Sequence, residues 1–278
     1  MPGPGQDPFF TIGVILMVMA VVGVIERVIP LHARARGNRA RLVPNLALTF
    51  ITFATNIVCN VALVAALAGL ETRGFGLLPM LALPPWATAL VVVLALDLSF
   101  WVAHVAMHKI PSLWRFHRVH HSDPAVDVTT TMRQHPGEGV IRYALLAAFA
   151  FPLGVGPGPF ALYRVASALS GLFEHANIRV PARLDGWLSL IFTWPGVHKV
   201  HHSRDARSTD TNYGNLFCWW DRLGGTFTPA HFGTAVTYGL DHLDDAATQT
   251  MAGLLRLPFR PGQAASDAPT AALNPERC

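Results

Sequence analysis

Histidines recur in this chain at spacings that suit metal binding. The octet Phe-His-Arg-Val-His-His-Ser-Asp at residues 116–123 returns as Val-His-Lys-Val-His-His-Ser-Arg at residues 197–204, and both copies contain His-x-x-His-His. Upstream, His104 and His108 form a His-x-x-x-His pair, so eight of the thirteen histidines lie in three clusters. Imidazole is the commonest metal ligand among side chains, and eight of them exceed what one ion can use. The clusters therefore predict a site for two transition-metal ions.

The spacing within the clusters predicts how the histidines meet if these segments are helical. Residues three or four positions apart share one face of a helix, so His104 and His108 project together. Each octet can offer three nitrogens to one site, or its adjacent histidines can diverge towards two ions. The isolated His32, His231 and His242 are interpreted as ordinary polar residues. In each octet the first histidine shares a face with both of the last two: His117 with His120 and His121, and His198 with His201 and His202.

Other metal chemistries fit these residues less well. A structural or transport zinc site needs only about four tetrahedral ligands. Soluble di-iron bundles use Glu-x-x-His and zinc proteases use His-Glu-x-x-His, and neither motif occurs in the sequence. Bis-imidazole haem ligation needs only a pair of facing histidines. Eight or more neutral nitrogens better suit two ions that keep open coordination positions.

The composition points to a membrane protein. Hydrophobic residues make up 51% of the 278 residues and charged residues only 14%, with a mean hydropathy of +0.36. Soluble domains carry about 25% charged residues. The net charge of +4 does not indicate nucleic-acid binding, because the basic residues follow the expected membrane topology. The three cysteines form no Cys-x-x-Cys pair, which argues against a disulfide framework or a thiolate zinc site.

Long runs without charge predict the membrane spans. A span needs about 20 apolar residues, and three runs meet this length. The N-terminus lacks the basic region of a secretory signal, so the first run is expected to be retained. Residues 143–174 form two shorter arms around Gly156-Pro157-Gly158-Pro159, which predict either a helical hairpin or two short tilted crossings. The three predicted spans cover residues 9–29, 45–70 and 86–108, each approximately.

The distribution of arginines predicts the orientation of the spans. The connection between the first two spans contains four of them, whereas the next connection contains only Glu71 and Arg73. By the positive-inside rule, the arginine-rich connection is cytoplasmic, and so is the end of the third span. The histidine clusters are therefore expected at the cytoplasmic face. The four arginines are Arg34, Arg36, Arg39 and Arg41.

These elements predict an all-α protein, a multi-span helical membrane bundle with a cytoplasmic, histidine-rich cap for two metals. We expect residues 1–261 to form one membrane-embedded domain, with the cap built from residues 109–142 and 175–261. Residues 262–278 are rich in Ala, Pro and small polar residues and are predicted to be a disordered tail. The expected location is a bacterial inner membrane or an ER-like membrane.

The three histidine motifs on a multi-span membrane protein resemble the fatty acid hydroxylase/sterol desaturase superfamily. The resemblance extends from about Asp97 to Phe227, close to half of the chain. It includes Leu-Phe-Glu-His-Ala-Asn at 172–177, Asn-Tyr-Gly at 212–214 and Trp-Asp-Arg-Leu at 220–223. Relatives often continue with Phe-Gly-Thr where this chain has Gly224-Gly225-Thr226, a change in local packing away from the metal ligands. The resemblance implies a non-haem di-iron centre that activates dioxygen and attacks an unactivated C–H bond of a lipid.

By motif position, the resemblance also implies the iron ligands. His175 matches an isolated histidine that lies between the two triplets in relatives, and it would be a ninth ligand. Some relatives have two histidines in that region, but position 171 is Gly171 here. His135 is a candidate tenth ligand, or a residue that supports one. The eight ligands in the three clusters are His104, His108, His117, His120, His121, His198, His201 and His202.

Polar side chains near the clusters are expected to hold the ligands in place. Metal-bound imidazoles usually donate their other N–H to a carboxylate or a carbonyl group. Asp97 lies two helical turns before His104 inside an otherwise apolar span, where an ionisable residue is functional by default, and its expected partner is a ligand histidine. Weaker candidates for the same role are Asp123, Asp210 and Asn212, followed by Glu138 and Glu174, which could instead solvate the surface.

The resemblance implies an O2-dependent oxidoreductase with a lipid substrate that enters from the bilayer. No redox domain is evident in the sequence, so a separate electron-donor protein is expected. Hydroxylation and desaturation use the same ligands, and the compact His-x-x-x-His pair favours hydroxylation by family analogy. Zinc could replace iron in a purified sample. A membrane metal carrier or sensor is the alternative class, although carriers place their ligands near the bilayer midplane.

Overall fold

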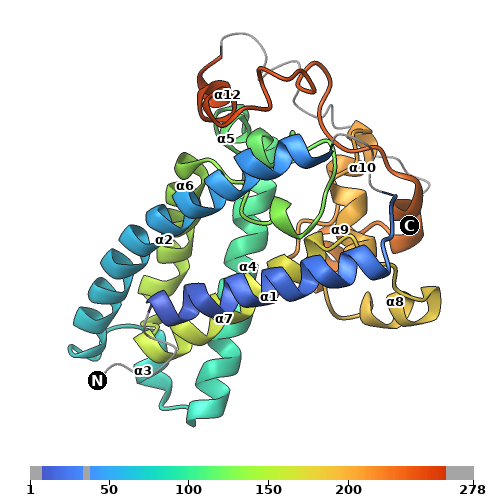
Figure 1. Ribbon diagram of the computed structural model, residues 1–278. Coiled ribbons are helices and arrows are strands. Elements are labelled where there is room, and N and C mark those ends of the chain that lie inside the picture. The colour runs from blue at the N-terminus through green and yellow to red at the C-terminus, as the bar shows by residue number, and fades with distance from the viewer. Residues whose placement is uncertain (1–7, 34–37, 261–278) are drawn as a thin grey trace.

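The structure is a computed structural model that describes residues 8–33 and 38–260. Over these ranges the chain is helical, and its β-structure is limited to two isolated bridges. The predicted all-α class is therefore confirmed. The predicted disordered tail, residues 262–278, lies outside the described residues. The long helices are α1 (Pro8–Val28), α2 (Leu42–Glu71), α4 (Pro85–Lys109), α6 (Pro136–Leu153) and α7 (Pro157–His175) (Figure 1).

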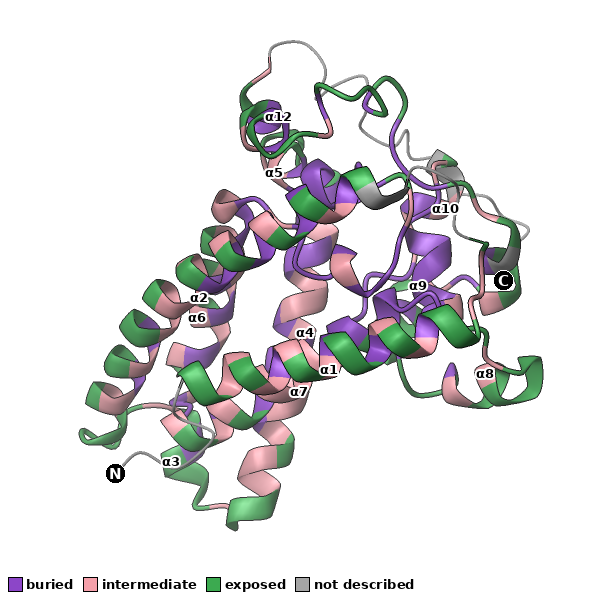
Figure 2. Ribbon diagram, viewed as in Figure 1, coloured by how far each residue is buried: buried purple, intermediate pink, exposed green. Residues whose placement is uncertain are grey.

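Three of these helices are long and apolar enough to cross a membrane, namely Phe9–Val28, Leu42–Glu71 and Pro85–Lys109. They carry large apolar side chains on their outer faces, and Val58 and Trp86 are 70% and 72% exposed. Figure 2 shows exposed residues along the outer sides of α1 and α2. Soluble monomers rarely expose contiguous apolar surface on this scale, so these faces suit contact with lipid. The predicted multi-span membrane bundle is confirmed.

Helix α4 is the central element of the bundle, and it packs against α5, α6 and α7. A buried apolar core joins α2, α4, α6 and α7, and it includes Leu67, Leu96 and Phe160 with no exposed surface. Because lipid tails are as apolar as these side chains, close packing between the helices stabilises this core within a membrane. This core packs α4 against α7, and His108 and His175 lie in the last turns of these two helices.

A short turn joins α6 to α7. Gly154 adopts a φ of 67°, the left-handed conformation that ends helix α6. Pro157 begins α7, where its fixed φ suits the first turn of a helix. The sequence predicts a turn near residues 156–159, and the structure has it directly before Pro157, because the prolines are accommodated in the start of α7. A Cβ atom on Gly154 would lie 2.2 Å from the carbonyl oxygen of Phe75, so the loop after α2 packs tightly against this turn.

Shorter elements complete the fold. Helices α5, α10 and α12 lie at one end of the bundle and α3 lies at the other (Figure 1). The short α-helices are α3 (Leu77–Leu81), α5 (Pro111–His121), α8 (Ala182–Leu188), α9 (Pro195–His201), α10 (Ala206–Thr209), α11 (Trp219–Gly224) and α12 (Met251–Arg256). The 3-10 turns are η1 (Asn38–Arg41), η2 (Val128–Thr130), η3 (Ala230–Ala235) and η4 (Leu257–Phe259).

Candidate metal centre

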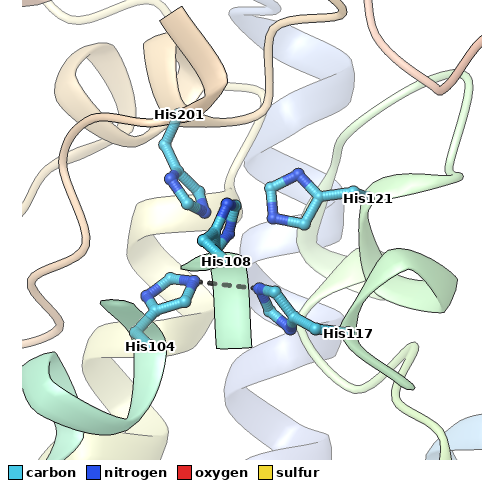
Figure 3. A group of neighbouring side chains, drawn as sticks. All are labelled: His104, His108, His117, His121 and His201. Carbon is cyan, nitrogen blue, oxygen red and sulfur yellow. Dashed lines mark hydrogen bonds between the residues drawn. The ribbon is translucent and has the colours of Figure 1, made fainter. Parts of the chain in front are cut away.

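Nine buried histidines gather in two groups where α4, α5, α7 and α9 meet. The ligand atoms of five histidines lie within 4.8 Å of one another in the first group, and the same holds for four histidines in the second. None of the nine is more than 4% exposed. Figure 3 shows the five rings of the first group around a shared centre. The first group is His104, His108, His117, His121 and His201, and the second is His120, His175, His198 and His202.

Each repeated octet is divided between the two groups. Helix α5 places His117 and His121 in the first group and His120 in the second. Helix α9 and the residue after it do the reverse, with His201 in the first group and His198 and His202 in the second. Residues four apart share a helix face, whereas adjacent residues point about 100° apart. Of the two arrangements that the spacing allows, the structure has the divergent one.

The two groups adjoin. The rings of His121 and His202 are stacked, with centroids 4.6 Å apart and planes within 19° of parallel. The rings of His198 and His201 are also stacked, with centroids 5.1 Å apart. Because each of these two pairs joins one group to the other, the nine histidines form one continuous polar core with two centres.

The nitrogens of the second group converge on one point. Nε2 of His175 lies 3.0 Å from Nε2 of both His120 and His198, and 3.2 Å from Nε2 of His202. Nδ1 of His175 lies 2.7 Å from the carbonyl oxygen of Gly171, which can only accept, so this Nδ1 carries the hydrogen. Nε2 of the neutral His175 ring then has a free lone pair directed at its neighbours. A cation at the point of convergence would satisfy these nitrogens.

The nitrogens of the first group also face one another around a shared point. Nε2 atoms of His108, His121 and His201 are buried and have no hydrogen-bond partner among the described residues. Nε2 of His104 and Nε2 of His117 lie only 3.0 Å apart (Figure 3). Leaving a buried polar atom unsatisfied costs about 1–3 kcal/mol, so several such atoms around one point are best explained by a missing partner. Both groups therefore fit a metal ion.

Backbone carbonyl groups fix the direction of two rings in the first group. Nδ1 of His104 donates to the carbonyl oxygen of Tyr213 at 2.8 Å, and Nδ1 of His201 donates to that of Thr211 at 2.8 Å. Both carbonyls belong to the loop between α10 and α11. Since a carbonyl accepts only, each ring has its hydrogen on Nδ1 and its lone pair on Nε2, which faces the centre.

Carboxylates contact the outer nitrogens of two of the three remaining rings in the first group. Nδ1 of His108 lies 3.3 Å from Oδ1 of Asp210, where the sequence predicts a supporting carboxylate. Nδ1 of His117 lies 3.0 Å from Oε1 of Glu138, which is fully buried and also binds Arg142 at 2.9 Å. Glu138 was the weaker candidate in the sequence, because its distance of 21 residues from His117 gives no sign of contact.

Asp97 does not contact a histidine, which corrects the prediction. Its Oδ1 accepts from the backbone N–H of Leu216 at 3.0 Å, and its Oδ2 accepts from Phe217 N–H at 3.2 Å and from Trp220 Nε1–H at 2.9 Å. The seven residues from Asp97 to His104 correspond to about 10 Å along a helix, which is too far for contact. Asp97 instead ties the loop before α11 to α4.

Asp123 also binds other partners than a histidine. It accepts from Arg41 and Asn45, both at 2.9 Å, so it ties the end of α5 to the start of α2. Burial by itself raises the pKa of Asp123, but the nearby guanidinium groups of Arg41 and Arg133 hold this pKa below its usual range. Arg133 donates to the carbonyl oxygen of Val119 at 3.1 Å, which fixes the backbone between the histidines of α5.

Asn212 holds the backbone near the second octet. Its Nδ2 donates to the carbonyl oxygens of Val197 at 3.0 Å and Thr228 at 2.9 Å. Its φ of 56° lies in the left-handed region, which asparagine tolerates better than most residues. The contact with Val197, directly before His198, positions the start of the histidine triplet without touching a ring.

His135 lies outside both groups, in contrast to its role as a candidate ligand. Its Nδ1 accepts from the backbone N–H of Gly137 at 2.9 Å and so caps the start of α6. Its Nε2 lies 3.3 Å from the carbonyl oxygen of Leu255. Both nitrogens therefore have partners in the protein, and neither is directed at a metal position.

Burial keeps the clustered imidazoles neutral. Desolvation in the protein interior lowers the pKa of the ligand candidates on α5, α7 and α9 well below the usual histidine value. Neighbouring imidazoles lower these pKa values further. Neutral imidazole is the form that binds metals, so both groups can bind a cation at neutral pH. The histidines concerned are His117, His120, His121, His175, His198, His201 and His202.

A cavity of about 670 Å³ reaches the histidines of both groups. His104 of the first group and His120, His175 and His198 of the second contribute to its wall. The rest of the wall comes mainly from apolar side chains of α1, α2, α6 and α7. Its volume is in the range of small-molecule sites, about 300–1,000 Å³. Because α1 and α2 are candidate spans, the cavity extends from the histidines into the membrane-embedded part of the bundle.

The chain is similar to several hydroxylases and monooxygenases. It is 36% identical over 145 residues to ornithine lipid hydroxylase OlsE of Rhizobium tropici, which covers 51% of this chain and 43% of that protein. It is 30% identical over 158 residues to alkylglycerol monooxygenase of Caenorhabditis elegans, covering 56% of this chain and 30% of the relative. The human alkylglycerol monooxygenase is 29% identical over 160 residues, covering 57% and 34%. The chain thus spans less than half the length of these relatives.

No solved structure matches the chain. The family model described as fatty acid hydroxylase matches residues 89–226, which is close to half of the chain and contains all nine histidines of the two groups. The family and the histidine groups together indicate a metal site. The motifs, the membrane helices and the matched relatives agree, and the chain belongs to the fatty acid hydroxylase family.

Proposed function

We propose that this chain is a membrane-bound lipid hydroxylase that uses dioxygen and external electrons at two irons held by the nine clustered histidines. The observation that carries the proposal is that histidines of both groups line one apolar cavity between candidate membrane spans. Two of its relatives are named for a lipid or an alkylglycerol together with a hydroxylation or monooxygenation. Such a substrate has long alkyl chains and resides in a bilayer, which matches the position of the cavity.

The donor set supports iron in both groups. Imidazole suits iron, copper, nickel and zinc, but zinc has no redox chemistry and cannot activate dioxygen. The first group offers five nitrogens and the second offers four. Histidines of the second group line the cavity, so an ion that they held would lie next to a bound lipid. Zinc in a purified sample would be a substitute for iron.

Bound iron would supply the activation of dioxygen, so that one C–H bond of the lipid becomes C–OH while two electrons and two protons reduce the second oxygen atom to water. The electrons would come from a separate donor protein. The chain itself positions the C–H bond and excludes water. Phe53 and Phe100 line the cavity together with His104 and His120. These apolar walls favour an alkyl chain next to the metal ligands and disfavour bulk water.

The orientation in the membrane is part of the proposal. Arg41, between the first two spans, binds Asp123 at the end of α5, so this connection lies on the same side as the histidines. Since arginine-rich connections are retained in the cytoplasm, we propose that the metal centre faces the cytoplasm. An electron donor would then dock on the cap, and the lipid would enter from the bilayer.

Metal analysis combined with an oxygen assay tests the proposal. Purified protein is reconstituted with iron, its metals are counted, and dioxygen uptake is followed with a reductant and a lipid extract. Two irons per chain and lipid-dependent uptake are expected, with a product heavier by one oxygen atom. A product lighter by two hydrogens would replace hydroxylation with desaturation. Tightly bound zinc, with no oxygen uptake after iron reconstitution, would favour a metal carrier and overturn the proposal.

Histidine variants test which residues bind the metals. His120→Ala and His201→Ala each remove a nitrogen from one group, and both are expected to lose iron and activity while the protein stays inserted in the membrane. His231→Ala changes an exposed histidine outside both groups and is expected to keep both properties. Full activity in His120→Ala or His201→Ala would contradict the assignment of the ligands.

A further inference from the structure

An arginine lines the cavity at a distance from the histidines. Arg164, on α7, contributes to the cavity wall, and its guanidinium carbon lies 4.8 Å from the centre of the Tyr143 ring. The hydroxyl group of Tyr143 donates to the backbone carbonyl oxygen of Asn56 at 3.3 Å. Asn56 lies at the middle of the candidate span Leu42–Glu71. Arg164 therefore lies beside the middle of a membrane span, facing the interior of the bundle.

The charge of Arg164 has no counter-ion within the described residues. The other cavity arginine, Arg142, is paired with Glu138 at 2.9 Å. Arg164 forms no such salt bridge in the described ranges, and the one carboxylate in the cavity wall, Glu174, lies ten positions further along α7. Ten helical residues correspond to about 15 Å, so Glu174 does not neutralise Arg164 directly.

Arg164 is partly buried, so its guanidinium loses part of its contact with water. A cation–π contact with the Tyr143 ring is weak compared with the cost of removing an ion from water. Ionisable residues within membrane bundles usually face a cavity and pair with a ligand or with each other. Arg164 fits this description, since its guanidinium contacts the side chain of Tyr143 but pairs with no carboxylate among the described residues.

Amide side chains extend the polar part of the wall. Asn56 and Asn60 are four residues apart on α2, share one face of the helix and both line the cavity. Together with Arg164 they make a polar patch inside an otherwise apolar wall. Guanidinium binds carboxylate and phosphate with two parallel hydrogen bonds, and amide N–H groups can donate to the remaining oxygen atoms.

We propose that Arg164, with Asn56 and Asn60, binds the anionic group of the lipid that occupies this cavity. The chemistry shared by the ligands is a terminal carboxylate or phosphate on an alkyl chain. The inference rests on the proposed function, because it specifies the substrate of that same cavity. Eleven residues of α7 separate Arg164 from His175, or about 16 Å. The oxidised carbon would thus be remote from the anionic group.

Binding of simple lipids to the purified iron-loaded protein tests the proposal without a catalytic readout. Affinities are measured for palmitate, hexadecyl phosphate and hexadecanol in a neutral detergent, at a pH where palmitate is ionised. Wild-type protein is expected to bind at least one of the two anions about ten-fold more tightly than the alcohol, the value of a charge-assisted hydrogen bond. The anion that is preferred identifies the group as carboxylate or phosphate.

Variants assign the preference to Arg164. Arg164→Leu and Arg164→Gln are expected to lose it while their affinity for hexadecanol stays as in the wild type, and Arg164→Lys is expected to retain part of it. Arg183→Leu, which removes an exposed arginine on α8 outside the cavity, is the matched control and should keep the full preference. Hexadecanol binding verifies that each variant has an intact cavity.

Two results would overturn the inference. Equal affinity of the wild type for both anions and for the alcohol would do so regardless of any variant, and so would a full anion preference in Arg164→Gln. The outcome is separate from that of the proposed function. Anion-selective binding without oxygen uptake would contradict the proposed hydroxylase function but support the anion site. Lipid-dependent oxygen uptake with no preference for anionic lipids would contradict the anion site alone.

Discussion

Nδ1 of His117 lies 3.0 Å from Oε1 of Glu138, and both side chains are fully buried. The same oxygen accepts from Nε of Arg142, one helical turn further along α6. Glu138 therefore connects a candidate metal ligand on α5 to a fixed charge on α6. An imidazole held in this way keeps its Nε2 directed at the centre of the first group.

Replacing Glu138 with glutamine is expected to weaken metal binding without unfolding the protein. The amide keeps the shape of the side chain but lowers the negative charge beside Nδ1, so the ring of His117 becomes a poorer ligand. Loss of such supporting partners usually costs 10–100-fold in metal affinity or activity. Competition with a chelator measures the change. Glu71→Gln, at the exposed end of α2, is the control, and equal chelator resistance in both variants would contradict the role of Glu138.

Much of the fold and of the site was predictable from local sequence. The apolar runs are long enough to indicate the spans, and the octet repeat contains six of the nine clustered histidines. Each of these signals consists of residues that are close together in the chain, and helical geometry alone relates the positions of such side chains. The sequence does not show whether each octet serves one metal site or two. That choice depends on how α5 and α9 pack, so only the structure decides it.

The partners of the polar residues were not predictable in this way. Asp97 binds backbone groups 119 and 120 residues further along the chain, and no periodicity relates such distant positions. His135 directly precedes Pro136, which suits the first position of a helix, so the sequence contains a local signal for its role as a helix cap. Tertiary packing decides these contacts, and local spacing does not.

Removing a single ligand is expected to empty one group and not the other. His202→Ala takes away one of the four nitrogens of the second group, whereas the first group keeps all five. The variant should therefore bind one metal per chain in place of two, and His108→Ala should do the same for the first group. Metal counting by mass spectrometry measures both. Loss of both metals in each single variant would mean that the two groups bind as one unit.

His135→Ala is expected to leave the metal content unchanged and to lower stability. The imidazole caps α6 through the N–H of Gly137, and losing a cap of this kind costs about 1 kcal/mol. His135→Asn restores a side-chain acceptor and should recover most of that loss. Thermal unfolding in detergent measures stability, and metal counting is done on the same samples. Loss of a metal from His135→Asn would return His135 to the ligand set.

Asp97→Asn is expected to lower stability more than it affects metal content. The carboxylate accepts from the N–H groups of Leu216 and Phe217 and from Trp220, so an amide NH2 group must face at least one donor. The cost of such an unsatisfied buried group is about 1–3 kcal/mol. Thermal unfolding measures it against Asp241→Asn, whose side chain is 74% exposed. If Asp97→Asn were as stable as this control, the N–H groups that Asp97 accepts from would have other acceptors, and the expectation would be wrong.

Narrowing the cavity is expected to change which lipids the protein accepts and to leave its metals in place. Ala161 on α7 lines the cavity, and Ala161→Phe would fill part of its volume with an aromatic ring. Long alkyl chains should then lose affinity, whereas short chains should be affected less, because only the long ones need the filled space. An overpacked site costs about 1–3 kcal/mol, which corresponds to roughly a ten-fold weaker affinity. Ala66→Phe, on the exposed face of α2 outside the cavity, is the matched control. Binding of a series of alcohols of increasing chain length measures the effect, and the same loss for every length, or none at all, would place the lipid elsewhere in the bundle.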